Sequence, residues 1–101
     1  MKISNVQFLE KVLRNSGKKI EDKFRGAVTV SVDEDGAAVG IAFASNSIPN
    51  YTIKLEPDGF ASVRASSFAA TRSADDVQQQ FEVNDIVRSM VVAMEMAVEY
   101  N

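Results

Sequence analysis

The chain has 101 residues, of which 46% are hydrophobic and 25% are charged, and it contains neither cysteine nor histidine. This length and apolar content fit one globular domain, residues 1–101, and exclude a disordered chain. The missing residue types exclude disulfides, cysteine nucleophiles and most transition-metal or hydrolytic sites, which depend on thiolates or imidazoles. No apolar stretch approaches the roughly 20 residues that a membrane span needs, so we expect a cytoplasmic protein.

Charge is divided unevenly along the chain. Residues 1–25 contain seven basic and three acidic side chains, whereas residues 26–101 contain four basic and eleven acidic ones, and the net charge is −3. This division indicates either a basic binding surface or two segments that attract each other in the folded protein.

The first predicted element is an amphipathic helix that begins near Ser4. Its apolar residues have helical spacing and are Val6, Leu9 and Leu13 with Phe8 and Val12 beside them. Ser4 suits the N-cap, and Gly17 is able to adopt the left-handed conformation that ends a helix. The charged connector that follows reaches Gly26, and within it Ile20 and Phe24 either extend the helix or restart it.

From Ala27 the hydrophobic period changes to two, which is typical of strands. Alternation and turn residues predict strands near 28–32, 38–43, 51–55 and 60–67, with turns at 33–36 and 56–59 and a loop at 46–50. Because connections this short favour antiparallel neighbours, the four strands are expected to form a meander.

The last third of the chain predicts a second helix. Ser73 and Asp76 have the spacing of a capping box, which favours a helix start at this point. The apolar stripe is interrupted near Asn84 and Asp85, so the segment 74–100 is either one helix or two.

Together these elements predict an α+β fold with the order α-β-β-β-β-α. One face of the meander is apolar and needs both helices as its cover, which places the helices on one side of the sheet. That face consists of Val28, Val30, Val32, Val39, Ile41, Phe43, Tyr51, Ile53, Leu55, Ala61, Val63 and Ala65. The opposite face is small and polar and is expected to be wet, and it lacks the outward aromatic rings on which RNA bases stack.

Residues 33–36 carry three acids and a glycine, like the start of a calcium loop. Neither Ala44 nor Ser45, where such a loop would end, is the bidentate glutamate that it needs, so a hairpin turn is favoured over a metal site. Glu95 and Glu99 lie one helical turn apart, as expected for the polar side of a surface helix, and the isolated glycines form no phosphate loop. We therefore predict no enzyme, no metal and no cofactor.

Basic residues of the first segment are one candidate binding surface. Spacings of three and four residues place several of them on one side of a helix, as contact with nucleic-acid phosphates requires. They are Lys11, Arg14, Lys18, Lys19, Lys23 and Arg25. Interrupting acids and a sequence pI of about 4.8 favour a solvated helix face instead.

The C-terminal helix is the other candidate, because it is apolar on more than one side. A helix that lies on a sheet needs only one apolar stripe. The surplus residues are Val91, Val92, Met96 and Tyr100. They either pack within the monomer or form an intermolecular interface, most simply a symmetric dimer.

The leading hypothesis is a non-enzymatic protein-interaction module that binds the surface of a partner protein. It would be a small accessory or inhibitor protein of the kind that phages and other mobile elements encode. A related hypothesis is that its acidic residues imitate phosphates toward a basic partner. The alternative is a nucleic-acid-binding protein that uses the basic N-terminal segment, with an affinity that falls steeply with salt.

Overall fold

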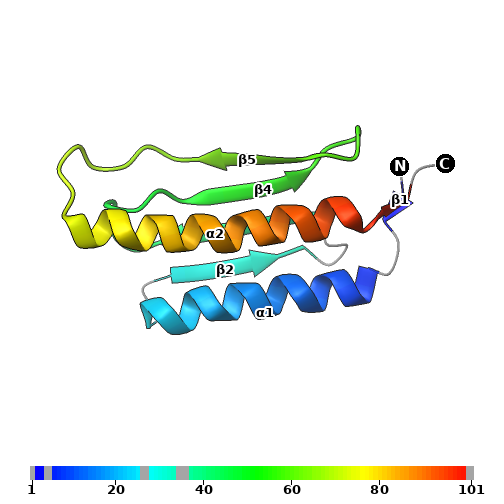
Figure 1. Cartoon of the computed structure of the whole chain (residues 1–101), viewed down its shortest axis with the longest axis horizontal. Coiled ribbons are helices and arrows are strands. Elements are labelled where there is room, and N and C mark those ends of the chain that lie inside the picture. The colour runs from blue at the N-terminus through cyan, green and yellow to red at the C-terminus, as the bar shows by residue number, and fades with distance from the viewer. Residues whose placement is uncertain (1, 4–5, 26–27, 34–36, 100–101) are drawn as a thin grey trace.

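The computed structural model describes residues 2–3, 6–25, 28–33 and 37–99 (Figure 1). Its elements are β1 (Lys2–Ile3), α1 (Val6–Phe24), β2 (Val28–Val32), β3 (Ala38–Phe43), β4 (Tyr51–Leu55), β5 (Ala61–Ala65), α2 (Ala74–Met96) and β6 (Val98–Glu99). The predicted order of helix, four strands and helix is confirmed, and so is the α+β fold class. Of the helices described, none is long and apolar enough to cross a membrane.

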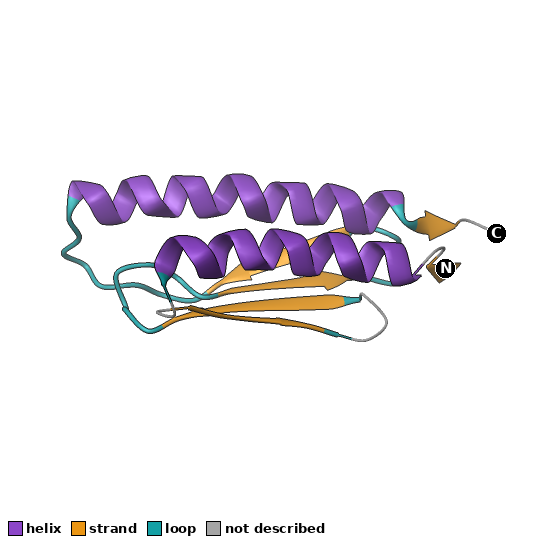
Figure 2. Ribbon diagram, turned by 90° about the horizontal axis from the view of Figure 1, so that it is seen from below, coloured by secondary structure: helices purple, strands orange, loops and turns teal. Residues whose placement is uncertain are grey.

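The four central strands form one antiparallel sheet in the order β2-β3-β4-β5. Each strand pairs with the next in the chain, with Val30 opposite Ile41 and Ile53 opposite Val63. Both helices lie on the same face of this sheet (Figure 2), as predicted. The opposite face is covered by none of the described elements, and β2 and β5 form the two edges.

The core lies between the two helices and the sheet. α1 packs over β2 and against α2, while α2 contacts both β4 and β5. The buried apolar side chains are Leu9, Leu13 and Ile20 from α1, Val83, Val87, Met90 and Met94 from α2, and Val28, Val39, Ile41, Tyr51, Ile53 and Leu55 from the sheet. Each buried side chain of this size stabilises the fold by roughly 1.5–3 kcal/mol.

Two residues predicted for the core are exposed instead. Val63 is 43% exposed, and Ala65 is exposed as well. Both belong to β5, which is an edge strand that α2 covers only in part. The prediction was wrong here because alternation identifies the face on which a side chain lies but not how far its strand extends beyond the helices.

α1 continues past Gly17 to Phe24, so the glycine does not end the helix. A Cβ at position 17 would lie 2.6 Å from Cγ1 of Val30, and the missing side chain therefore lets the helix approach β2 closely. Ile20 is buried, and the ring of Phe24 meets that of Phe43 edge-on at a centroid distance of 4.9 Å. These contacts show that the connector extends the first helix.

α2 is one continuous helix with the predicted capping box. The Ser73 hydroxyl accepts the N–H of Asp76 at 3.0 Å, and the Asp76 carboxylate accepts the N–H of Ser73 at 3.1 Å. The helix does not break at Asn84, whose Oδ1 accepts a hydrogen bond from the Tyr51 hydroxyl at 2.7 Å. Asn84 therefore interrupts the apolar stripe because it makes a polar contact with the sheet.

A second, two-stranded sheet was not predicted. Lys2 of β1 lies opposite Glu99 of β6, and Ile3 lies opposite Val98, so the first and last strands meet at one end of the molecule (Figure 1). Strands of two residues are too short for a hydrophobic period to show. Ser4, the predicted N-cap of the first helix, lies outside the described residues.

Candidate interaction surface

The side of α2 that faces away from the sheet carries exposed apolar residues. Phe81, Val92 and Met96 are 61%, 53% and 79% exposed, and we call these three residues the α2 stripe. Phe81 and Val92 are eleven residues apart, or about three helical turns, so they lie on the same side. The buried row of α2 therefore has an apolar counterpart on the solvent side.

The α2 stripe overlaps only in part with the surplus residues predicted from the sequence. Val92 and Met96 belong to both sets, whereas Val91 is partly buried and packs against the core. Tyr100 lies outside the described residues. Phe81 was missed as a member, although its three-turn spacing from Val92 is visible in the sequence.

Charged residues lie within the α2 stripe, between Phe81 and Val92. The side chains of Asp85 and Arg88 are 78% and 80% exposed, and their closest polar atoms are 3.8 Å apart. A pair this exposed contributes little to stability. The pair places two charges on the same side of the helix as the apolar residues, so the exposed surface of α2 is mixed.

The cations that were predicted to contact phosphates, five on α1 and Arg25 directly after it, are all exposed, but they do not form one uninterrupted basic surface. Arg14 is bound to Glu10, with 2.8 Å between Nη2 and Oε1. Lys23 forms an ion pair with Glu82 of α2. Two of the six predicted cations thus have an acidic partner. One of these acids lies on α1 and the other on α2.

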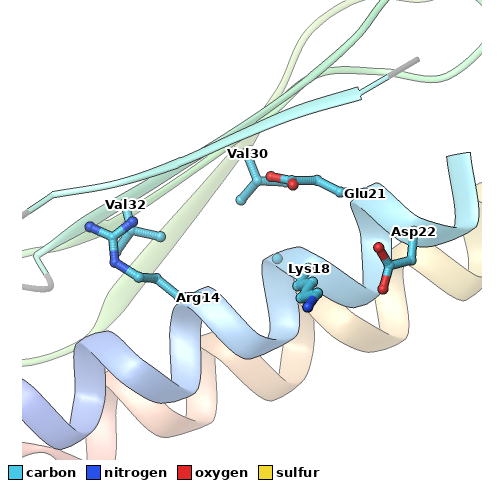
Figure 3. Close-up of a pocket in the computed structure, with 7 residues that line it drawn as sticks. Arg14, Lys18, Glu21, Asp22, Val30 and Val32 are labelled. Atoms are coloured by element: carbon cyan, nitrogen blue, oxygen red, sulfur yellow. The ribbon is translucent and has the colours of Figure 1, made fainter. Parts of the chain in front are cut away.

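A groove of about 290 Å³ runs between α1 and β2 (Figure 3). Its lining consists of Arg14, Gly17, Lys18, Glu21, Asp22, Val30 and Val32. Figure 3 shows that the Arg14 and Glu21 side chains extend toward the strand. Because the groove combines two cations with two acids, a phosphate bound in it would meet repulsion as well as attraction.

The outer face of the sheet has a second open groove, of about 310 Å³, over β4 and β5. It is lined by Thr52, Lys54, Glu56, Ser62 and Arg64. The Ser62 hydroxyl donates to Oε1 of Glu56 at 2.8 Å, which holds that carboxylate beside β5. Small and polar residues cover this face, as the sequence predicted.

A polar cluster joins the start of α2 to the sheet. Burial raises the pKa of the Tyr51 hydroxyl, which donates to Asn84. The guanidinium of Arg72 lies 3.8 Å from the ring centre of Phe68 and also donates to Gln80. These contacts fix the segment between β5 and α2, and each polar group in them already has a partner.

Within the described residues, no three acidic side chains are grouped so that they could hold a metal ion. The acids of the turn at 34–36 lie outside those residues. Comparison with protein families, curated proteins and solved structures finds no match to this chain. Function is therefore inferred from the surfaces of the molecule.

Proposed function

We propose that this protein is a non-enzymatic interaction module, a small accessory or inhibitor protein that binds a partner through the α2 stripe. The observation that carries the proposal is the exposure of Phe81, Val92 and Met96, each by more than half, on one side of a regular helix. Covering large apolar side chains contributes roughly 1.5–3 kcal/mol each when burial is complete. Methionine adds a flexible side chain that adapts to the shape of a partner.

The expected mode of binding is a helix laid into an apolar groove of the partner. Phe81 and Val92 serve as anchors about three turns apart, and Met96 extends the contact by one more turn. Asp85 and Arg88 place charge between Phe81 and Val92 on the same side of the helix. The capping box and the buried row already order α2, so binding need not supply the free energy of helix formation.

The test compares two variants that each add two positive charges. Val92→Lys with Met96→Lys alters the stripe, and Gln7→Lys with Asn15→Lys alters exposed positions of α1. Each tagged protein is used for affinity capture from lysate with and without nuclease, and the retained protein is then purified for titration. We expect the stripe variant to bind that protein at least tenfold more weakly and the control variant to bind as the unaltered chain does.

Equal binding by both variants would reject the α2 stripe as the contact surface. Retention that is lost with nuclease, and with Lys18→Glu plus Lys19→Glu, would support nucleic-acid binding by α1 instead. Circular dichroism of each variant separates lost binding from lost structure.

A further inference from the structure

The β5 edge directs unused backbone groups away from the sheet. The N–H of Glu56 donates to the carbonyl of Phe60, and the N–H of Ser66 donates to that of Asn50, each at 2.9 Å. The backbone N–H and C=O groups of the even-numbered residues of β5 therefore point toward β4. Because the pattern alternates in an antiparallel ladder, the backbone groups of the odd-numbered residues point away from β4, along the free edge. The outward residues are Ala61, Val63 and Ala65.

The β5 edge lacks the proline and the edge-facing charge that usually prevent an edge strand from pairing with another chain. Residues 61–65 contain no proline, and their one charge, Arg64, lies on the outer face and not along the edge. Ala61 and Ala65 leave room for another backbone, while Val63 exposes 43% of its surface on the helix side. In the described part of the chain, β5 pairs only with β4.

We propose that β5 pairs antiparallel with β5 of a second copy of this chain, centred on Val63. The two sheets then form one continuous eight-stranded sheet related by a two-fold axis. In this register Val63 lies opposite Val63 of the partner subunit, and Ser62 lies opposite Arg64 of the partner subunit. The apolar area that α2 leaves uncovered on β5 is buried at the axis.

Charge on the outer face is complementary in this register. Ser62 holds the Glu56 carboxylate through a 2.8 Å hydrogen bond. Because Ser62 and Arg64 of the partner subunit form a pair without mutual backbone hydrogen bonds, their Cα atoms are about 4.5 Å apart. The guanidinium is then within reach of the Glu56 carboxylate, and the two-fold axis makes this contact twice. Lys54, which pairs with Ser62 in the sheet, is a second cation on this face.

The positions of the helices favour β5 over β2 for this pairing. α2 contacts both β4 and β5, whereas α1 packs over β2 itself (Figures 1 and 2). Adjacent strands are about 4.8 Å apart, so pairing through β5 separates the two α2 helices by about 10 Å. Packed helices need about 8–10 Å between their axes. The same pairing through β2 would bring two α1 helices to about 5 Å, which is too close.

The α2 stripe faces away from the sheet and stays exposed in this dimer. Pairing through β5 and partner binding through the stripe are thus separate, and either can fail alone.

The first test measures mass by sedimentation equilibrium over a range of concentrations. The unaltered chain should be a dimer. Val63→Lys adds a charge at the axis and should weaken dimerisation at least tenfold. Val32→Lys makes the same change at the β2 edge and should leave the dimer intact. A monomer at every concentration, or equal effects of the two substitutions, would overturn the proposal.

A charge exchange tests the register. Glu56→Arg alone and Arg64→Glu alone each place like charges together twice, and each should reduce dimerisation at least tenfold. An equimolar mixture of these two variants places opposite charges at both contacts and should restore dimers, each with one chain of each kind. If the mixture stays as monomeric as its components, Glu56 and Arg64 do not meet across the axis and the register is wrong.

Discussion

α1 and α2 lie side by side on one face of the sheet, yet they present different chemistry to solvent. α1 buries one row of apolar residues and carries charges such as Lys11, Lys18 and Asp22 on its exposed side. α2 buries an equivalent row and carries the α2 stripe on its exposed side. Covering the sheet accounts for the buried rows of both helices, but it does not account for Phe81, Val92 and Met96.

The buried apolar row of each helix serves folding, whereas exposed apolar residues are available to a partner. Among the described side chains of α1, Phe8 is the large apolar one that is exposed, at 62%. Single residues of this kind are normal on protein surfaces. Three lie on one side of α2, with Asp85 and Arg88 between Phe81 and Val92, which makes α2 the helix whose solvent side calls for a binding role.

The largest expected effect on the free energy of unfolding distinguishes the buried side of α2 from its exposed side. Met90 is fully buried, and Met90→Ala should lower the free energy of unfolding by about 2–5 kcal/mol because it leaves a cavity. Met96 is 79% exposed, and Met96→Ala should change that free energy by no more than about 0.5 kcal/mol. Urea unfolding measures both values. Similar losses for the two variants would mean that Met96 is buried in solution.

A smaller effect concerns the seating of α1 on β2. Gly17→Ala places a Cβ 2.6 Å from Cγ1 of Val30. Overpacking costs about 1–3 kcal/mol, and the better helix propensity of alanine returns about 1 kcal/mol, so we expect a net loss near 1 kcal/mol. In a Val30→Ala background the nearest atom is the Cβ of residue 30 at 3.3 Å, so the same substitution should cost less there. Thermal unfolding of the four proteins decides this, and a gain in both backgrounds would contradict a close contact.

An effect of similar size concerns the start of α2. Ser73→Ala removes the hydroxyl that accepts the N–H of Asp76, and it should cost about 1 kcal/mol. Ser89→Ala is the matched control on the exposed side of the same helix and should have little effect. Unfolding in urea compares them, and equal stability of the two variants would show that the capping box does not stabilise α2.

The sequence was sufficient to predict the two helices, the four central strands and their order because each of these elements repeats a local rule. The change from helical spacing to alternation marks the start of the strands, and short turns fix the meander. Ser73 and Asp76 identify the start of α2 through contacts within a single turn. None of these inferences needs knowledge of a distant residue.

The sequence was insufficient where a role depends on a distant contact. A glycine suits a helix end and a close approach equally well, and only Val30 shows which role Gly17 has. Val63 alternates like a core residue, but its exposure depends on where α2 crosses the sheet. The surplus of apolar residues on the last helix was visible in the sequence. That Phe81 is exposed while Val91 is partly buried depends on the rotation of the helix about its axis.

The ribbon of β1 and β6 has a mechanical consequence. Lys2 lies opposite Glu99 at the outer end, and Ile3 lies opposite Val98 nearer the helices. A force that pulls the first and last strands apart therefore breaks the outer pair first and the inner pair second. The two pairs do not resist the force together, as they would in shear. Once they open, the load passes to the contact between α1 and α2, so stretching should peel the helices from each other before it reaches the four-stranded sheet.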